Sequence, residues 1–285
     1  MIKTLAKCVR EYKLPAILTV LFIAGEAIIE AIIPFVTAKL VNGIEDGREI
    51  SYVLKMGGIL VALALVSLAC GGIAAFTCAK ASAGFAKNLR HDMFGKVQSY
   101  AFGNIDKFSS SSLVTRMTTD ITNVQMSFMM ITRIAIRAPL LLIFSIIMAF
   151  IMGGSLATTF VIVVPFLTCG LLLVAKFAMP AFRRVFKKYD KLNESIEENV
   201  RGMRVVKGFS REDYEKEKFG EARENIRIDF TRAERIVALN TPLMNFCMYF
   251  NMAVILIFGS FMAIKGTYGV QIGQISALLT YGMSV

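Results

Sequence analysis

The sequence has little charge, one histidine and no tryptophan. Charged residues make up 19% of its 285 residues, against about 25% in an ordinary soluble domain. The five cysteines form no CxxC pair, and a single histidine cannot supply a cluster of metal ligands. These absences argue against a disulfide framework and against a metal site. We expect inert thiols at Cys8, Cys70, Cys78, Cys169 and Cys247.

Long apolar runs are abundant instead. Hydrophobic residues make up 55% of the sequence, and the mean hydropathy is +0.60. The runs reach about twenty residues, the length at which an α-helix crosses a hydrocarbon core of about 30 Å. We therefore expect an all-α membrane protein with six spans, the sixth of them incomplete. The expected spans cover about residues 14–37, 56–77, 134–152, 156–179, 243–264 and 272–285.

Basic residues are distributed unevenly between these runs. The net charge is +11, from 32 Lys and Arg against 21 Asp and Glu, a balance that in a soluble protein would suggest nucleic acid. Only four basic residues fall in or beside the first, third and fifth connections: Lys39, Arg48, Lys55 and Lys265. Because basic residues near spans stay in the cytoplasm, we expect a multi-pass protein of the cytoplasmic membrane with a cytoplasmic N-terminus. We expect no nucleic-acid partner.

The two long inner connections carry a helical period. After the second span, Phe85, Leu89 and Met93 begin an apolar stripe with a spacing of three or four residues. In the second inner segment, residues 182–203 and 219–237 carry two more stripes. These patterns predict two antiparallel helical hairpins that reach into the cytoplasm.

Each hairpin turns through residues typical of helix starts. The first turns through residues 104–120, where serine can cap a short helix carrying Leu113 and Arg116. The second turns at residues 202–208, and residues 210–213 place acidic side chains in the first turn of a new helix. We expect a short helix across each tip, suited to docking in a groove on a partner.

The two tips resemble two motifs of one family. Residues 106–120 are similar to the segment FDKTPTGEL-SRLTND of type I ABC exporter transmembrane domains, and residues 193–212 to their segment NE-IQE-I-GI-VVKAFG-E. The matching residues of the first motif are Asp106, Lys107, Leu113, Arg116 and Asp120. Those of the second are Asn193, Glu194, Glu198, Gly202, Val205, Val206, Lys207, Phe209 and Glu212.

The resemblance implies a six-helix exporter domain with an elbow helix at residues 1–13, where Leu5 and Val9 can lie among lipid headgroups. Two such half-transporters form a homo- or heterodimer, and a coupling helix at each tip docks on a nucleotide-binding domain. By analogy, the coupling helices cover about residues 111–118 and 211–219. The implied coupling residues are Ser111, Leu113, Val114, Arg116, Met117, Asp120, Arg211, Glu212, Tyr214 and Phe219.

The chain contains no GxxxxGK[ST] phosphate loop, so we assign it no catalytic residue and no bound cofactor. The resemblance implies that ATP and Mg bind a nucleotide-binding domain absent from this chain, either beyond residue 285 or on a separate polypeptide. It implies an ATP-driven, multidrug-type exporter of amphipathic compounds such as drugs, lipids or peptides. Whether the full-length protein is an ATP-hydrolysing enzyme is left open. The alternatives are a proton- or ion-coupled secondary transporter and a truncated, non-transporting remnant.

Carboxylates within the first span are candidates for substrate contact. Glu26 and Glu30 lie one helical turn apart, on one face of the span. Charged groups inside spans are costly and are often functional. The pair could attract a cationic amphiphile, or could instead bind neighbouring helices. Arg133 and Arg137 are expected to anchor the third span at the membrane interface.

The fifth span carries the remaining candidates for a substrate cavity. Asn245 and Asn251 could line such a cavity, or could hydrogen-bond across helices and hold them together. Met248 would add an adaptable apolar surface, although methionine is also ordinary filling in a helix bundle.

Overall fold

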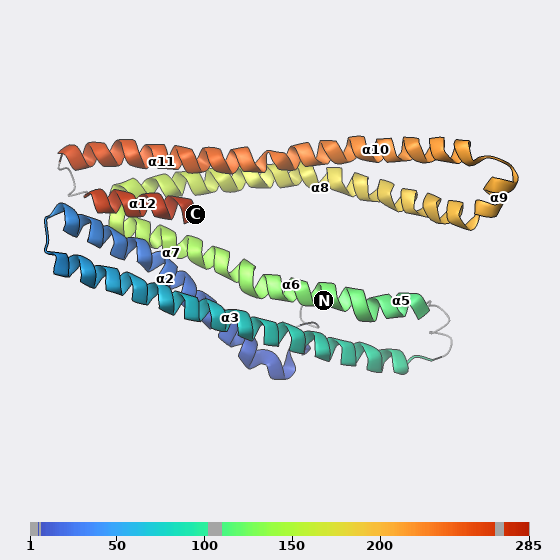
Figure 1. Cartoon of the computed structure of the whole chain (residues 1–285), viewed down its shortest axis with the longest axis horizontal. Coiled ribbons are helices and arrows are strands. Elements are labelled where there is room, and N and C mark those ends of the chain that lie inside the picture. Colours follow the sequence, from blue (N-terminus) through green and yellow to red (C-terminus); the bar gives the residue numbers. More distant parts are fainter. Residues whose placement is uncertain (1–4, 6, 102–109, 266–270, 285) are drawn as a thin grey trace. The chain divides into compact units, whose positions relative to one another are not determined.

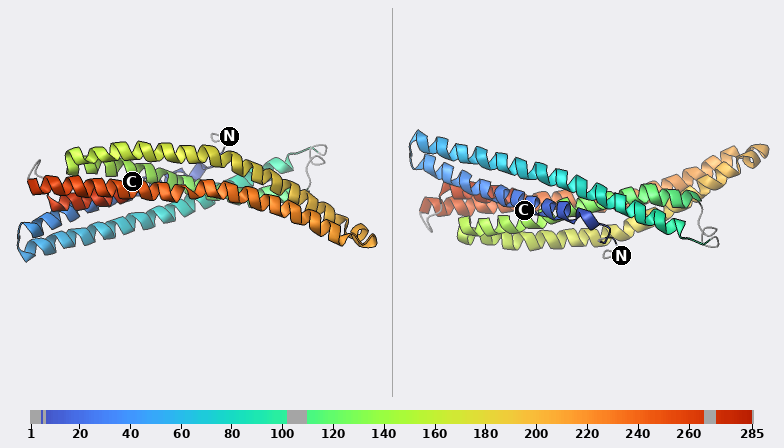
Figure 2. Two further views of the ribbon diagram at one scale, coloured as in Figure 1. Left: turned by 90° about the horizontal axis from the view of Figure 1, so that it is seen from above. Right: turned by 90° about the horizontal axis from the view of Figure 1, so that it is seen from below.

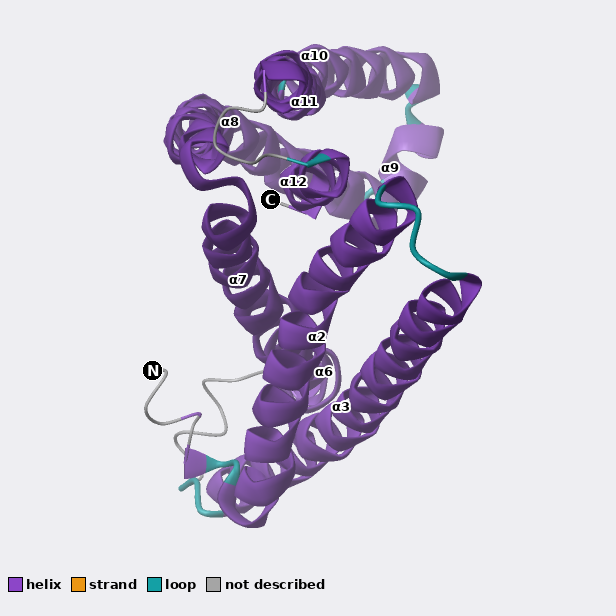
Figure 3. Ribbon diagram, turned by 90° about the vertical axis from the view of Figure 1, so that its left-hand side faces the viewer, coloured by secondary structure: helices purple, strands orange, loops and turns teal. Residues whose placement is uncertain are grey.

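The computed structural model describes residues 5, 7–101, 110–265 and 271–284. Within these ranges the secondary structure consists of helices and their connections (Figure 3). The all-α fold with long apolar helices is therefore confirmed. The described helices are η1 (Arg10–Tyr12), α2 (Lys13–Glu45), α3 (Ile50–Gln98), α5 (Ser110–Thr115), η2 (Arg116–Asp120), α6 (Ile121–Met130), η3 (Ile131–Ala135), α7 (Ile136–Gly153), η4 (Gly154–Ala157), α8 (Thr158–Arg201), α9 (Met203–Gly208), α10 (Glu212–Ala238), α11 (Asn240–Lys265) and α12 (Ile272–Ser284).

Four continuous helical stretches of the described chain are long and apolar enough to cross a membrane: Arg10–Glu45, Ile50–Gln98, Ser112–Arg201 and Glu212–Lys265. The third contains two of the expected spans, which are joined by the turn η4. Gly154 begins this turn with a φ of 49°, a left-handed conformation that glycine adopts without strain. The chain thus folds as a multi-pass membrane protein. The six-span plan stays a prediction, because α12 has only 13 described residues.

The chain divides into two compact units. The first unit comprises residues 1–158 and 255–285 and contains α2, α3, α7 and α12. In it α2 packs along α3, and the hydroxyl of Thr19 donates to Thr77 Oγ1 at 2.9 Å. The start of α12 lies beside the end of α2, because the Gly273 N–H donates to Asn42 Oδ1 at 2.7 Å. Further along, the Tyr281 hydroxyl donates to the Ala31 carbonyl at 2.6 Å, so α12 runs antiparallel to α2.

Gly273 lets α12 approach the backbone of α2. A Cβ built on Gly273 would collide with the Ala38 carbonyl oxygen and with Asn42 Oδ1. We expect Gly273→Ala to lower the free energy of unfolding by about 1–3 kcal/mol, the usual cost of overpacking. Thermal unfolding in detergent measures this loss. Gly72→Ala is the matched control, because a Cβ there would meet no atom within 4 Å. Equal melting temperatures for the two variants would contradict the prediction.

Part of the N-terminal segment packs on α3. Residues 1–4 and 6 of the expected elbow helix lie outside the described residues. Cys8 and Val9 are buried against Phe85 of α3, and the depth of this segment in the membrane stays a prediction. Arg10 Nη2 donates to Asp92 Oδ1 at 2.9 Å, so an ion pair adds to this packing.

The second unit, residues 159–254, is a helical hairpin. In Figure 1 and in both views of Figure 2, α8 runs beside α10 and α11. Phe182 and Phe230 meet edge to face, with ring centroids 6.2 Å apart. Lys188 Nζ lies 2.6 Å from Asp229 Oδ2. This contact lies beyond the apolar runs, and the hydrogen bond from Lys188 holds the pKa of the Asp229 carboxyl below its ordinary value.

The described tips differ from the expected short transverse helices. At the second tip the short helix is α9, and residues 212–219 form the first turns of the long helix α10. The acidic first turn of α10 is present as expected. At the first tip, α5 continues through the π-helical turn η2 into α6. The expected helix over residues 111–118 is therefore the start of a long rod, while residues 102–109 lie outside the described residues.

Candidate functional site

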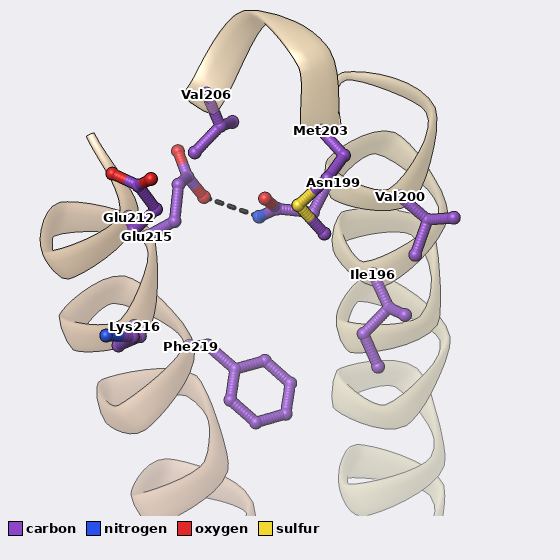
Figure 4. Close-up of a pocket in the computed structure, with 9 residues that line it drawn as sticks. All are labelled: Ile196, Asn199, Val200, Met203, Val206, Glu212, Glu215, Lys216 and Phe219. Atoms are coloured by element: carbon purple, nitrogen blue, oxygen red, sulfur yellow. Dashed lines mark hydrogen bonds between the residues drawn. The ribbon is translucent and has the colours of Figure 1, made fainter. Parts of the chain in front are cut away.

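The tip of the second unit holds a mainly apolar groove of about 440 Å³. It opens between the end of α8 and the start of α10, where α9 reverses the chain (Figure 4). The groove is lined by Ile196, Asn199, Val200, Met203, Val206, Glu212, Glu215, Lys216 and Phe219. Its volume is within the range of small-molecule or side-chain binding sites.

The local sequence explains how this tip forms. Gly202 interrupts the helix after α8, and its N–H donates to the Glu198 carbonyl at 2.8 Å. After α9, Ser210 adopts a φ of 51°, which turns the chain toward α10. The Arg211 N–H then donates to the Val206 carbonyl at 3.0 Å and closes the turn. Acidic residues follow in the first turn of α10, where the helix dipole favours negative charge.

One polar contact bridges the two walls of the groove. Asn199 Nδ2 donates to Glu215 Oε2 at 2.5 Å, the dashed line of Figure 4. Beside it, Lys216 Nζ binds Asp213 Oδ1 on the same helix at 2.9 Å. These contacts satisfy charged groups at the rim and leave the apolar side chains of the groove uncovered. The groove therefore resembles the centre of a docking surface with a polar rim.

Large apolar side chains around the groove are also exposed. Val205 is 62% exposed, Phe209 75% and Tyr214 58%. These residues lie beyond the apolar membrane runs, and large apolar side chains exposed around a groove there favour a binding surface. The Arg211 guanidinium lies 6.0 Å from the centre of the Tyr214 ring, at the outer limit of a cation–π contact.

The structure brings the predicted residues of the second tip together. Glu212 and Phe219 line the groove, whereas Arg211 and Tyr214 lie beside it. Sequence reasoning missed the wall of the groove contributed by α8 and α9: Asn199, Met203, Val206 and their neighbours. The apolar stripe of α8 could have indicated this wall in the sequence. The stripe continues beyond the packed part of the hairpin to Val200, which is 64% exposed.

The predicted residues of the first tip lie on α5 and η2. Val114 is 60% exposed, and Arg116 and Asp120 are exposed on the π-helical turn. Leu113 and Met117 are partly buried. Ser111 is described in its backbone only. A π-helical turn is often found at functional positions, and the docking role of this tip stays a prediction.

The carboxylates of the first span have a partner that sequence reasoning did not find. Arg137 of α7 binds Glu30 Oε1 at 2.6 Å and lies 3.5 Å from Glu26 Oε1. The alternative that these residues bind a neighbouring helix is the one that this geometry supports. It also corrects the expectation for Arg137, which pairs with acidic residues on α2 instead of serving only as an interfacial anchor.

The candidates in α11 differ in exposure. Asn251 is 3% exposed, and its Oδ1 has no hydrogen-bond partner among the described residues. Asn245 is exposed and Met248 is partly buried. Among the described residues no hydrogen bond joins Asn245 to another helix, so the interpretation as an interhelical tie gains no support here.

Comparison with known proteins agrees with this architecture. Residues 16–284 match the family model of the ABC transporter transmembrane region. The chain is 28% identical over 279 residues to the uncharacterized ABC transporter ATP-binding protein YfiB of Bacillus subtilis, covering 97% of this chain and 48% of that protein. It is 25% identical over 250 residues to the uncharacterized ABC transporter ATP-binding protein Rv1273c of Mycobacterium tuberculosis, covering 87% and 42%.

A third relative is named for its substrate. The ATP-dependent lipid A-core flippase of Pseudomonas syringae pv. tomato is 26% identical over 203 residues, covering 70% of this chain and 33% of that protein. The chain spans about half the length or less of these curated relatives. With a family match over nearly all of its residues, the chain belongs to the ABC transporter transmembrane family.

Proposed function

We propose that this chain is the membrane domain of an ATP-driven exporter of amphipathic compounds. The observation that carries the proposal is the uncovered apolar groove at the tip of α8 and α10, in a chain that belongs to the ABC transporter transmembrane family. An apolar groove that faces water, beyond the membrane-spanning part, is suited to a protein partner. In an ABC transporter the partner required at this place is a nucleotide-binding domain.

In this proposal the second tip transmits force. The side chains of Phe209 and Tyr214 insert into the nucleotide-binding domain, while the rim charges of Glu212 and Lys216 set the register of docking. The ion pair of Lys188 with Asp229 and the aromatic contact of Phe182 keep α8 and α10 together as one rod. Movement of the nucleotide-binding domain is then passed along both helices to the membrane-spanning segments. The membrane domain alternates between two states, and the exported compound and ATP shift this equilibrium because each binds one state more tightly than the other.

The assembly that we propose follows the family plan. Six spans cross the cytoplasmic membrane with the N-terminus in the cytoplasm, supported by the distribution of basic residues. Two half-transporters form the working dimer. ATP and Mg bind to the nucleotide-binding domains, in line with relatives that are named ATP-binding proteins. The sequence of this chain has no phosphate loop of its own.

The substrate class is an amphiphile, in line with the lipid A-core flippase among the relatives. A helical membrane domain with many methionines offers an adaptable apolar surface. We include multidrug compounds in this class, because they combine an apolar body with a polar or charged group, as lipids do.

Transport by the full-length protein in proteoliposomes tests the proposal. We expect movement of cationic dyes or fluorescent lipids that needs ATP and persists after a protonophore removes any proton gradient. A catalytically inactive nucleotide-binding domain is the control, and it should abolish movement. Transport driven by a proton gradient without ATP would contradict the proposal and would favour a secondary transporter.

A further inference from the structure

A second cavity lies in the first unit, away from the tip. It has a volume of about 590 Å³ and is bounded by the end of α2, the end of α11 and the start of α12. Its walls are mainly apolar and include Leu256, Ile272, Ile275 and Leu279. One carboxylate, Glu45, and two hydroxyls, Ser260 and Ser276, are the polar groups among its lining residues.

Two features of the helices shape this cavity. Gly259 allows α12 to approach α11, because a Cβ at this position would lie only 3.1 Å from Ile275 Cγ1. Near the end of α11 and the start of α12, Ile264 is 86% exposed and Ile272 is 54% exposed. The close approach at Gly259 therefore bounds the cavity on one side, while Ile264 and Ile272 of its lining stay exposed.

The carboxylate at the cavity, Glu45, is exposed. Within the described residues no ion pair or hydrogen bond reaches Glu45. The nearest basic residues in the sequence are held at aromatic rings: Lys39 lies 4.5 Å from the centre of Phe35, and Arg48 lies 4.7 Å from that of Tyr52. Lys265, at the end of α11, likewise lies 4.3 Å from the centre of the Phe261 ring. The cavity thus combines an apolar wall with one carboxylate that forms no ion pair within the described residues.

We infer that this cavity binds a lipophilic cation, with its apolar body between α11 and α12 and its positive group at Glu45. The walls belong to the fifth and sixth expected spans, whereas Glu45 lies about eight residues, or roughly 12 Å, past the first apolar run. A single amphiphile can therefore keep its apolar part at membrane depth and its charge near the interface. Anionic amphiphiles are disfavoured, because Glu45 repels them. The inference deepens the proposed function by naming a charge class and a site for the exported compound.

Equilibrium binding without ATP tests this site separately from transport. The chain contains no tryptophan, so Leu279→Trp introduces a single reporter at the cavity wall. In phosphatidylcholine nanodiscs, a bromoaryl quaternary ammonium compound should quench this tryptophan at a concentration about fivefold lower than its neutral isostere, in which carbon replaces nitrogen. Ile272→Trp provides a second reporter if the first variant does not fold.

Removing the carboxylate should remove the preference for the cation. In the Leu279→Trp background, we expect Glu45→Gln to bring the two quenching curves together. Glu49→Gln is the matched control, because Glu49 lies at the same end of the unit but does not line the cavity, and it should leave the fivefold difference unchanged. Equal quenching by the two compounds before substitution, or a difference that survives Glu45→Gln, would overturn the inference.

A bilayer lipid is the competing occupant. Nanodiscs made with brominated acyl chains report lipid in the cavity through the same tryptophan. We expect the non-brominated cation to relieve that quenching, and Glu45→Gln to weaken the relief. Quenching by brominated lipid that the cation does not relieve would show that lipid alone fills the cavity. Because none of these measurements uses ATP, their failure would leave the proposed coupling at the second tip unaffected.

Discussion

Replacing Phe209 and Tyr214 together with alanine is expected to reduce ATP-dependent transport by about tenfold or more, as loss of aromatic side chains at the centre of an interface does. Both side chains are exposed in this chain, 75% and 58%, so their removal leaves no cavity in its interior. The loss should appear in transport assays with the full-length protein, while melting temperature stays unchanged. ATP hydrolysis should continue without stimulation by substrate.

The control for this experiment is Tyr189→Ala, which removes an aromatic side chain of α8 that is 40% exposed but does not line the groove at the tip. We expect it to keep transport near the level of the unmodified protein. If the double variant transports as well as the control does, the second tip is not the coupling surface. A double variant that also fails to fold would be replaced by Phe209→Leu with Tyr214→Phe, which keeps most of the apolar area and should restore transport.

Arg137→Gln is expected to destabilise the first unit more than the loss of either carboxylate. The substitution leaves Glu26 and Glu30 next to each other without their counter-charge, in an apolar segment. Breaking a buried ion pair is costly because the remaining charge is unpaired. Since Arg137 and Glu30 are 38% and 31% exposed, we reduce the expected cost to about 2 kcal/mol. Thermal unfolding of the purified protein in detergent measures this effect.

Neutralising Glu26, Glu30 and Arg137 together should recover part of the stability that is lost in Arg137→Gln. In the triple variant Glu26→Gln, Glu30→Gln, Arg137→Gln, no unpaired charge remains, so its melting temperature should exceed that of Arg137→Gln alone. Arg133→Gln is the control, because Arg133 is an exposed arginine one turn earlier on the same rod. A triple variant less stable than Arg137→Gln would show that the carboxylates do not depend on Arg137. Transport by the triple variant also tests whether the carboxylates contact a substrate. Unchanged transport of a cationic compound would show that it does not need them.

Local patterns in the sequence determined the membrane class, the apolar runs and the two helical rods. Hydrophobic length and a period of three to four residues are properties of one segment, so no partner is needed to recognise them. Helix α3 continues to Gln98, well past its apolar run, as its stripe predicted. The acidic first turn of α10 was also predictable, because the helix dipole acts on residues next to each other in the chain.

Contacts between segments were decided only by the tertiary structure. Arg137 and Glu30 are separated by 107 positions, and Asn199 and Glu215 meet only because α9 reverses the chain. The burial of Val9 against Phe85 likewise depends on the place where the N-terminal segment meets α3. A helical period shows which side chains share a face, but the register and partner of that face depend on packing between helices. For this reason the sequence predicted the rods, whereas the form of their tips, the groove, the ion pairs of Arg137 and the cavity beside Glu45 became visible only in the folded chain.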